Sequence, residues 1–268
     1  MIRYLVTVAI VSIAASAQTI QFSAVPQEIV ERRLGAYTKK NDQREPAIRQ
    51  LFEEAGCAGE KLTEQPVKRL KAPNLICSLP GATEAAIVVG AHFDLIEAGD
   101  GVVDNWSGAS LLSSLHQGLA GVPRQHTFRF VAFSGEEQGM VGSKAYVQQL
   151  GKTHEQVIAM VNLDTLGLNE TEVWVSHADP KLVQLMQRAA VTLKLPLSGM
   201  NAERVGSTDS ESFREKKIPA ITIHSLTSET LPILHSGRDR IEAIHMDEYY
   251  RTYRLVLAYL ALLDQSLE

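Results

Sequence analysis

Two adjacent glutamates, Glu136 and Glu137, lie in the stretch FSGEEQGMVGS, between an apolar run and a glycine-rich turn. Two neighbouring like charges repel each other unless a cation or a hydrogen-bond network compensates them. Other histidines and carboxylates stand near the ends of apolar runs elsewhere in the chain. They are His92 and Asp94 after AAIVVGA, Asp164 after VIAMVNL, His235 after LPIL, and Asp104 on a loop that enters a helical pattern. These side chains are the first candidates for chemistry.

This set of imidazoles and carboxylates has the composition of a metal site. Zinc accepts imidazole nitrogen and carboxylate oxygen, and a catalytic zinc site keeps one position open for water. Two zinc ions that share a carboxylate can hold a water between them as nucleophile and polarise a substrate carbonyl. Such a pair needs one bridging acid and two further protein ligands for each ion, and the chain offers enough candidates for this.

The elements that must position these residues are short apolar strands that alternate with helical patterns. Strands are predicted at residues 74–79, 85–93, 127–134, 157–164, 171–176 and 219–225. Helices are predicted at residues 26–38, 46–57, 106–120, 139–151, 180–194, 207–217 and 247–265. This alternation is typical of an α/β fold in which helices cover both faces of a mostly parallel sheet. Such sheets bind ligands at the carboxyl ends of their strands, so the candidate residues should converge there.

Five stretches of the sequence resemble a family of zinc exopeptidases, typified by bacterial leucyl aminopeptidases and aminopeptidases S and Y. Glutamate carboxypeptidase and the glutaminyl cyclases are relatives of that family. The stretches are GAHFDLIEAGDGVVDNWSGAS, FVAFSGEEQGMVGS, VNLDTLG, STDSESFREKKIPAI and LHSGRDRIEAI, in the family's order over roughly residues 74–262. The resemblance implies a three-layer helix-sheet-helix fold with a mixed, mostly parallel central sheet, of the phosphorylase/hydrolase-like type.

The resemblance also implies a role for each candidate residue. Asp104 would bridge two zinc ions. The remaining ligands would be His92 and Asp164 on one ion, and Glu137 and His235 on the other. Glu136 would then be the general base, which takes a proton from the attacking water and returns it to the leaving amine. The two adjacent glutamates would therefore have different tasks.

Several neighbours of these residues are weighed against plainer interpretations. Asp94, two residues after His92, suits a role in which its carboxylate orients the imidazole. Asp239 either supports the loop of His235 or is a surface acid. His224 is the main rival of His235, which is preferred because it alone fits the family's His-x-x-x-Asp pattern.

Two departures from the family's pattern affect the substrate pocket rather than the metals. The chain has Thr208-Asp209-Ser210 where relatives usually carry Ser-Asp-His, and Arg240 stands where a small hydroxyl residue is common. Asn105 and Gly108, in DNWSG, are expected to shape the turn that presents Asp104 and to open the following helix.

The function that follows from the resemblance is that of an exported metalloaminopeptidase, acting on peptides with a free N-terminus. The alternatives are a glutaminyl cyclase-like acyltransferase with one zinc, a carboxypeptidase of the same family, and a binding module that retains the fold without catalysis. The formal charge of −5 and the absence of a lysine or arginine cluster in the sequence argue against a nucleic-acid partner.

The ends of the chain and its two cysteines bear on location. Residues 1–17 combine Arg3, an apolar stretch too short to span a membrane, and a small-residue cleavage pattern, as in a secretory signal peptide. Residues 18–268 would then form a single catalytic domain in a secreted or periplasmic protein, not bound to the membrane. In that compartment Cys57 and Cys77 could pair, or each could be a small buried residue.

Overall fold

The computed structural model describes residues 21–153, 155–201 and 206–267. The predicted signal peptide at residues 1–17 lies outside them and stays a prediction. Within the described residues, no helix is both long enough and apolar enough to cross a membrane. The predicted division into a signal peptide and a single domain likewise remains a prediction.

An eight-stranded mixed sheet forms the centre of the fold, in the order β1-β2-β4-β3-β5-β8-β6-β7. The strands are β1 Leu62–Gln65, β2 Asn74–Leu79, β3 Ala86–His92, β4 Thr127–Phe133, β5 Val157–Leu163, β6 Glu172–Val173, β7 Ser198–Gly199 and β8 Ala220–His224. The four central strands, β4, β3, β5 and β8, are parallel to one another. Toward the edges β1 pairs antiparallel with β2, β2 with β4 and β6 with β8, while β7 pairs parallel with β6. The parallel strands are buried on both faces, which explains why they are nearly continuous apolar runs.

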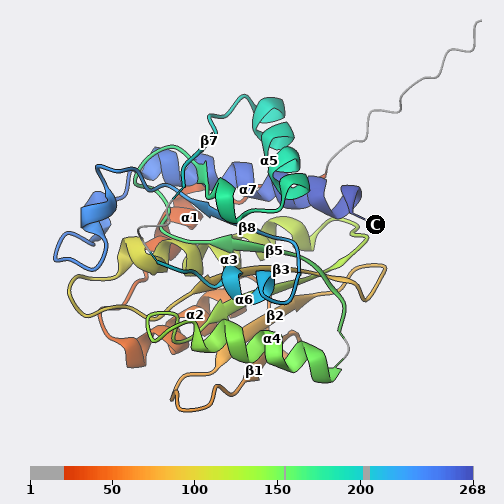
Figure 1. Ribbon diagram of the computed structural model, residues 1–268, viewed down its shortest axis with the longest axis horizontal. Helices are drawn as coiled ribbons and strands as arrows, with labels where there is room; N and C mark the ends of the chain where they lie inside the picture. The colour runs from red at the N-terminus through yellow and green to blue at the C-terminus, as the bar shows by residue number, and fades with distance from the viewer. Residues whose placement is uncertain (1–20, 154, 202–205, 268) are drawn as a thin grey trace, which may run out of the picture.

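Helices cover both faces of this sheet (Figure 1). On one face lie α1 Gln27–Leu34, α2 Asn41–Glu54, α3 Ser107–Ala120, α5 Pro180–Leu193 and α7 Met246–Ser266, which share one large apolar core with the sheet. On the other face α4 Val141–Thr153 and α6 Ser210–Arg214 enclose a smaller core around Phe133, Tyr146 and Phe213. The three-layer helix-sheet-helix fold predicted from the sequence is therefore confirmed.

Element boundaries differ from the predictions where tertiary contacts decide them. Helix α2 begins at Asn41 rather than at Pro46, which lies inside the helix. A proline one turn into a helix removes a hydrogen bond without ending the helix there. The strand predicted at residues 171–176 is only two residues long, and a 3₁₀ turn, Val175–His177, replaces its end. The edge strands β1 and β7 were not predicted, because neither shows an alternating apolar pattern.

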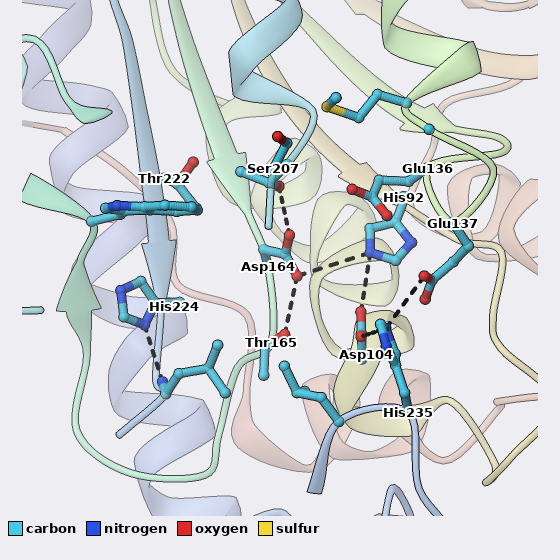
Figure 2. A pocket seen from close by; sticks show the side chains of 16 residues that line it. His92, Asp104, Glu136, Glu137, Asp164, Thr165, Ser207, Thr222, His224 and His235 are labelled. Carbon is cyan, nitrogen blue, oxygen red and sulfur yellow. Dashed lines mark hydrogen bonds and ion pairs between the residues drawn. The ribbon is translucent and has the colours of Figure 1, made fainter. Parts of the chain in front are cut away.

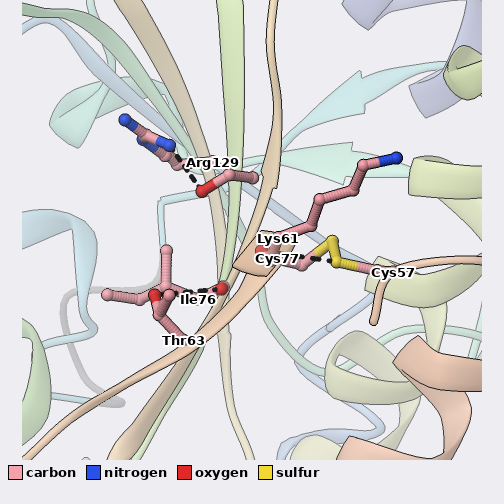
Figure 3. The surroundings of a disulfide bond; sticks show 7 residues. Cys57, Lys61, Thr63, Ile76, Cys77 and Arg129 are labelled. Carbon is pink, nitrogen blue, oxygen red and sulfur yellow. Dashed lines mark hydrogen bonds between the residues drawn. A yellow bond between two sulfur atoms is a disulfide. The ribbon is translucent and has the colours of Figure 1, made fainter. Parts of the chain in front are cut away.

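The two cysteines form a disulfide bond (Figure 3). Cys57 follows the end of α2 and Cys77 lies in β2, and both are fully buried. Of the two interpretations left open by the sequence, pairing is the one that the structure contains. The bond ties the helical layer to the antiparallel side of the sheet.

Candidate metal centre

The predicted site residues converge at the carboxyl edge of the parallel strands, around a pocket of about 350 Å³. His92 is the last residue of β3, Asp164 directly follows β5, and the Glu136–Glu137 pair comes shortly after β4. Asp104 lies in the irregular turn between β3 and α3, and His235 follows a short 3₁₀ helix. Figure 2 shows these side chains facing one another across the pocket.

Asp104 occupies the middle of the cluster. One of its oxygens lies 3.1 Å from Nε2 of His92, and the other lies 3.1 Å from Nε2 of His235. Beyond His92, the Oδ1 atom of Asp164 is 3.9 Å from the same Nε2. Beyond His235, the Oε2 atom of Glu137 is 3.3 Å from that Nε2. The cluster thus divides into two donor groups that share one carboxylate.

Both donor groups have the chemistry and the compactness of a zinc site. In each group the possible ligand atoms lie within 4.8 Å of one another: His92, Asp104 and Asp164 in one, and Asp104, Glu137 and His235 in the other. Each group offers one imidazole and two carboxylates, which are zinc ligands, and a fourth position remains for water or substrate. The second oxygen of Glu137 is buried and has no hydrogen-bond partner among the described residues. These residues therefore fit the metal that the sequence predicted.

The electrostatics of the cluster also favour a cation. Burial raises the pKa of Glu136 to about 9, and burial together with the neighbouring charge of Asp104 raises the pKa of Glu137 to about 7. Burial also raises the pKa of the Asp104 carboxyl, but the hydrogen bonds to the two imidazoles outweigh it and hold this pKa well below its usual range. So many buried acids cannot all be ionised without compensation. A divalent cation supplies that compensation and lowers the pKa of each acid beside it.

Several residues at the site have a positive φ. His235 has a φ of 51° and Thr165, next to Asp164, a φ of 60°, in the left-handed region that non-glycine residues seldom adopt. Gly135, with a φ of 72°, turns the chain from β4 into the Glu136–Glu137 pair. A Cβ atom there would lie 2.4 Å from Cδ1 of Leu70, the end of a side chain that can move, so the positive φ is the main reason for glycine at this position.

Asp94 holds the two glutamates in place. Its Oδ1 accepts a hydrogen bond from the backbone N–H of Glu136 at 3.0 Å, and its Oδ2 accepts one from that of Glu137 at 3.2 Å. Its contact with the imidazole is looser, since Oδ1 lies 3.6 Å from Nδ1 of His92 while the backbone oxygen of Asp94 is at 3.3 Å. Asp94 was predicted to orient the imidazole of His92. It also supports the loop of Glu136 and Glu137, where its hydrogen bonds are shorter than its contact with the imidazole.

Asp239 supports the backbone at Asp104 in a similar way. It is 3% exposed, and its carboxylate accepts hydrogen bonds from the backbone N–H groups of Val103, at 2.7 Å, and Asp104, at 3.2 Å. The interpretation of Asp239 as a surface acid is therefore wrong. Asn105 shapes the same turn, because its Oδ1 accepts hydrogen bonds from the N–H groups of Gly108 and Thr165.

The Thr208-Asp209-Ser210 stretch lies beside the Asp164 side of the cluster. Thr208 donates a hydrogen bond of 2.6 Å to Oδ2 of Asp164, and Ser210 shares one of 2.8 Å with Thr222 of β8. Asp209 is fully buried, and burial raises its pKa to about 7. Thr208 thus contacts a predicted metal ligand directly, so this departure from the family's pattern bears on the metal centre as well as on the pocket wall.

Arg44 is a supporting residue that sequence reasoning missed. It lies on α2, is fully buried, and its guanidinium donates hydrogen bonds to the backbone oxygens of Thr38, Phe93, Asp100 and Gly101, at 2.8 to 3.1 Å. Phe93 directly follows His92 at the end of β3, and Asp100 and Gly101 lead into the turn that contains Asp104. Its partners are backbone carbonyls from distant segments, so no local pattern could have revealed it.

His224, the rival histidine, belongs to the pocket wall rather than to either donor group. Its Nδ1 accepts a hydrogen bond of 3.0 Å from the N–H of Leu226, and burial lowers its pKa to about 4. Figure 2 shows it on the far side of Asp164 from Asp104. Together with Trp174, Thr222 and Leu226 it lines the part of the pocket away from the donor groups.

The α/β sheet carries at its carboxyl edge two groups of possible metal ligands that share Asp104, an arrangement suited to a metal-dependent hydrolase. Residues 74–260 match the pattern of peptidase family M28, and the chain belongs to this family. The family resemblance inferred from the sequence is confirmed.

Individual relatives within and around this family share only a modest sequence identity with the chain. The chain is 27% identical over 201 residues to a probable leucine aminopeptidase of Arthroderma benhamiae, covering 70% of this chain and 56% of that protein. It therefore spans little more than half the length of this relative. A crystal structure of the LapA aminopeptidase of Legionella pneumophila has a similar fold, with a TM-score of 0.78 at 20% identity, covering 91% of this chain and 73% of LapA.

Two further solved structures are similar in different ways. BSAP, a zinc aminopeptidase from Bacillus subtilis, is 26% identical with a TM-score of 0.65, over 74% of this chain and 50% of BSAP. A glutaminyl cyclase from Fimbriiglobus ruber shares the fold at 17% identity with a TM-score of 0.68, over 92% of this chain and 99% of the cyclase.

Proposed function

We propose that this chain is an exported aminopeptidase that hydrolyses N-terminal residues from peptides at a dinuclear zinc site. The observation that carries the proposal is the pair of donor groups that share Asp104. Glu136 belongs to neither of these two groups, although with His92 and Glu137 it forms a further group whose possible ligand atoms lie within 4.8 Å of one another. Zinc use is supported by membership of family M28 and by the likeness to a zinc aminopeptidase. Export rests on the sequence of residues 1–17.

His92 and Asp164 would hold one ion, Glu137 and His235 the other, and Asp104 both. When bound, the ions would polarise the substrate carbonyl and lower the pKa of the attacking water. The remaining tasks fall to the protein's own side chains.

Glu136 is the proposed general base. It lines the pocket beside the donor groups, and its backbone N–H is fixed by Asp94, so its side chain leaves a defined point of the loop. Its carboxylate takes the proton of the attacking water and delivers it to the nitrogen of the leaving amine, which breaks the peptide bond. The wall formed by Trp174, Thr222, His224 and Leu226 receives the side chain of the first substrate residue.

The proposal is tested with Glu136→Gln and Asp104→Ala, compared by metal analysis and by rates on a panel of aminoacyl chromogenic substrates. Glu136→Gln should bind as much zinc as the unmodified protein while its turnover falls by about 10²- to 10⁴-fold, the usual contribution of a general base. Asp104→Ala should lose zinc as well as activity. Near-normal turnover of Glu136→Gln would show that the assigned base is wrong.

A glutaminyl cyclase activity is the second candidate, because the chain spans 99% of the Fimbriiglobus ruber cyclase but far less of the aminopeptidases. A peptide with N-terminal glutamine separates the two functions. Release of ammonia with formation of pyroglutamate and no shortening of the chain indicates a cyclase. Release of free glutamine indicates an aminopeptidase. Blocking either terminus of the same peptide also distinguishes an aminopeptidase from a carboxypeptidase.

A further inference from the structure

A second hollow adjoins the metal centre, with a volume of about 600 Å³. It lies between α4, α6 and the loop after β1, and Figure 1 shows these two helices on the same face of the sheet. Gly139 lines both this hollow and the pocket of the metal centre, so the two are neighbours at that residue. We name the hollow the lysine groove, after Lys68, Lys144 and Lys216 in its lining.

The charge of the lysine groove is opposite to that of the chain as a whole. The three lysines are exposed, and Glu215 is the acid among the lining residues. The full sequence carries a formal charge of −5, so this positive patch stands out from an acidic background. Lys144 lies at the junction with the metal centre, because its Nζ donates a hydrogen bond of 3.0 Å to the backbone oxygen of Gly139.

The remaining lining suits an extended peptide. Val141 and Ala145 are partly exposed and give the groove apolar surface, while Val67 and Val147, which also line it, are almost fully buried. Along α4, the groove extends from Val141 to Gln148, which corresponds to roughly 10 Å of helix at about 1.5 Å per residue. An extended peptide rises about 3.3 Å per residue, so this length accommodates about three residues.

We infer that the lysine groove binds the part of a peptide substrate that follows the cleaved bond, and that it favours acidic residues or a terminal carboxylate there. The inference rests on the proposed peptidase function and adds the substrate class. A peptide whose first residue lies at the metal centre would run past Gly139 into the lysine groove. There Lys144 would contact the backbone and the acidic side chains of the peptide. Lys68 and Lys216 would then attract the carboxylates further along.

The test compares kcat/KM for two pentapeptides with the same first two residues, followed by aspartate and glutamate in one and by lysine and arginine in the other. The first residue is the one preferred on aminoacyl p-nitroanilides, which do not reach the groove. At low salt the acidic peptide should be hydrolysed about tenfold more efficiently, and the preference should shrink as salt screens exposed charges.

Variants of the lining residues test whether the lysine groove causes this preference for acidic peptides. In the triple variant Lys68→Gln, Lys144→Gln, Lys216→Gln, the ratio of kcat/KM for the acidic peptide to that for the p-nitroanilide should fall about five- to tenfold. Glu215→Gln should raise the same ratio. Lys181→Gln, which removes an exposed lysine on α5, serves as the matched control and should leave the ratio unchanged.

The outcomes separate this inference from the proposed function. If neither peptide nor p-nitroanilide is hydrolysed, the proposed function is wrong and the inference falls with it. If both are hydrolysed but the acidic and basic peptides react equally, the inference alone is wrong. An equal fall of the ratio in the triple variant and in Lys181→Gln would also overturn it, because general charge rather than the groove would then explain the preference.

Discussion

Replacing Asp94 by asparagine should weaken zinc binding without removing a single ligand. The carboxylate of Asp94 accepts hydrogen bonds from two consecutive backbone N–H groups, those of Glu136 and Glu137, with separate oxygens. An asparagine side chain has one acceptor oxygen and one NH₂ group. Whichever way it turns, one of the two N–H groups faces a donor instead of an acceptor, and the loop must shift.

The magnitude follows from this lost bond. A buried N–H left without its acceptor costs about 1–3 kcal/mol, and Asp94 is only 8% exposed. Loss of a group that positions metal ligands typically lowers metal affinity by about 10- to 100-fold. We therefore expect Asp94→Asn to bind zinc about 10- to 100-fold more weakly in competition with a chromogenic chelator, with kcat lower even at saturating zinc.

Asp264 offers a matched control far from the metal centre. Its two oxygens accept hydrogen bonds from the consecutive N–H groups of Gln125, at 2.9 Å, and His126, at 2.7 Å, and it is 5% exposed. Its Oδ1 also lies 3.3 Å from Nδ1 of His126, as Asp94 lies beside a histidine. Asp264→Asn should cost similar stability in urea unfolding but leave zinc affinity unchanged. Equal zinc affinities for Asp94→Asn and the unmodified protein, or an equal loss in both variants, would refute the reasoning.

Three other predictions concern stability. Cys57→Ala with Cys77→Ala should lower the free energy of unfolding by about 3 kcal/mol, measured in urea, because a cross-link that closes a loop of this size restricts the unfolded chain. Burial lowers the pKa of His116 to about 4, below its usual 6.5. Because the unfolded chain then takes up a proton at His116 more readily than the folded protein does, the stabilisation that its buried neutral imidazole gives the folded state is complete above pH 6.5 and is lost as the pH falls toward 4. That loss amounts to up to about 3 kcal/mol, and in His116→Phe the unfolding free energy should depend less on pH over this range. Arg44→Met should lower both the melting temperature and zinc affinity, whereas a surface change such as Arg188→Met should affect neither.

The parts of the fold that sequence reasoning predicted are those governed by local patterns. The apolar runs of β3, β4 and β5 are buried on both faces, and the rule that parallel strands expose their carboxyl ends at one edge placed His92 and Asp164 together. The short strand β7 has no such pattern, since its two residues are exposed and are defined by pairing with β6. Its existence depends on a partner distant in sequence.

The supporting residues of the site show the same limit. Asp94 was singled out because it stands two residues from a candidate ligand, yet its best hydrogen bonds reach a loop about forty residues away. Asp239 could not be told from a surface acid, because the N–H groups that it binds lie 136 and 135 residues earlier. A sequence shows which side chains are available, whereas such long-range pairings appear only when the chain is folded.

The guanidinium of Arg44 also bears on where the catalytic unit begins. Residues 74–260 carry the proposed ligands and base, and a shortened protein with these limits would look complete on paper. It would nevertheless lack the helix whose arginine binds the backbone oxygens of Phe93 and Gly101, in the segment that leads to Asp104, and it would leave Cys77 without its partner. Shortened versions of this protein should therefore retain the chain from before Asn41 onward.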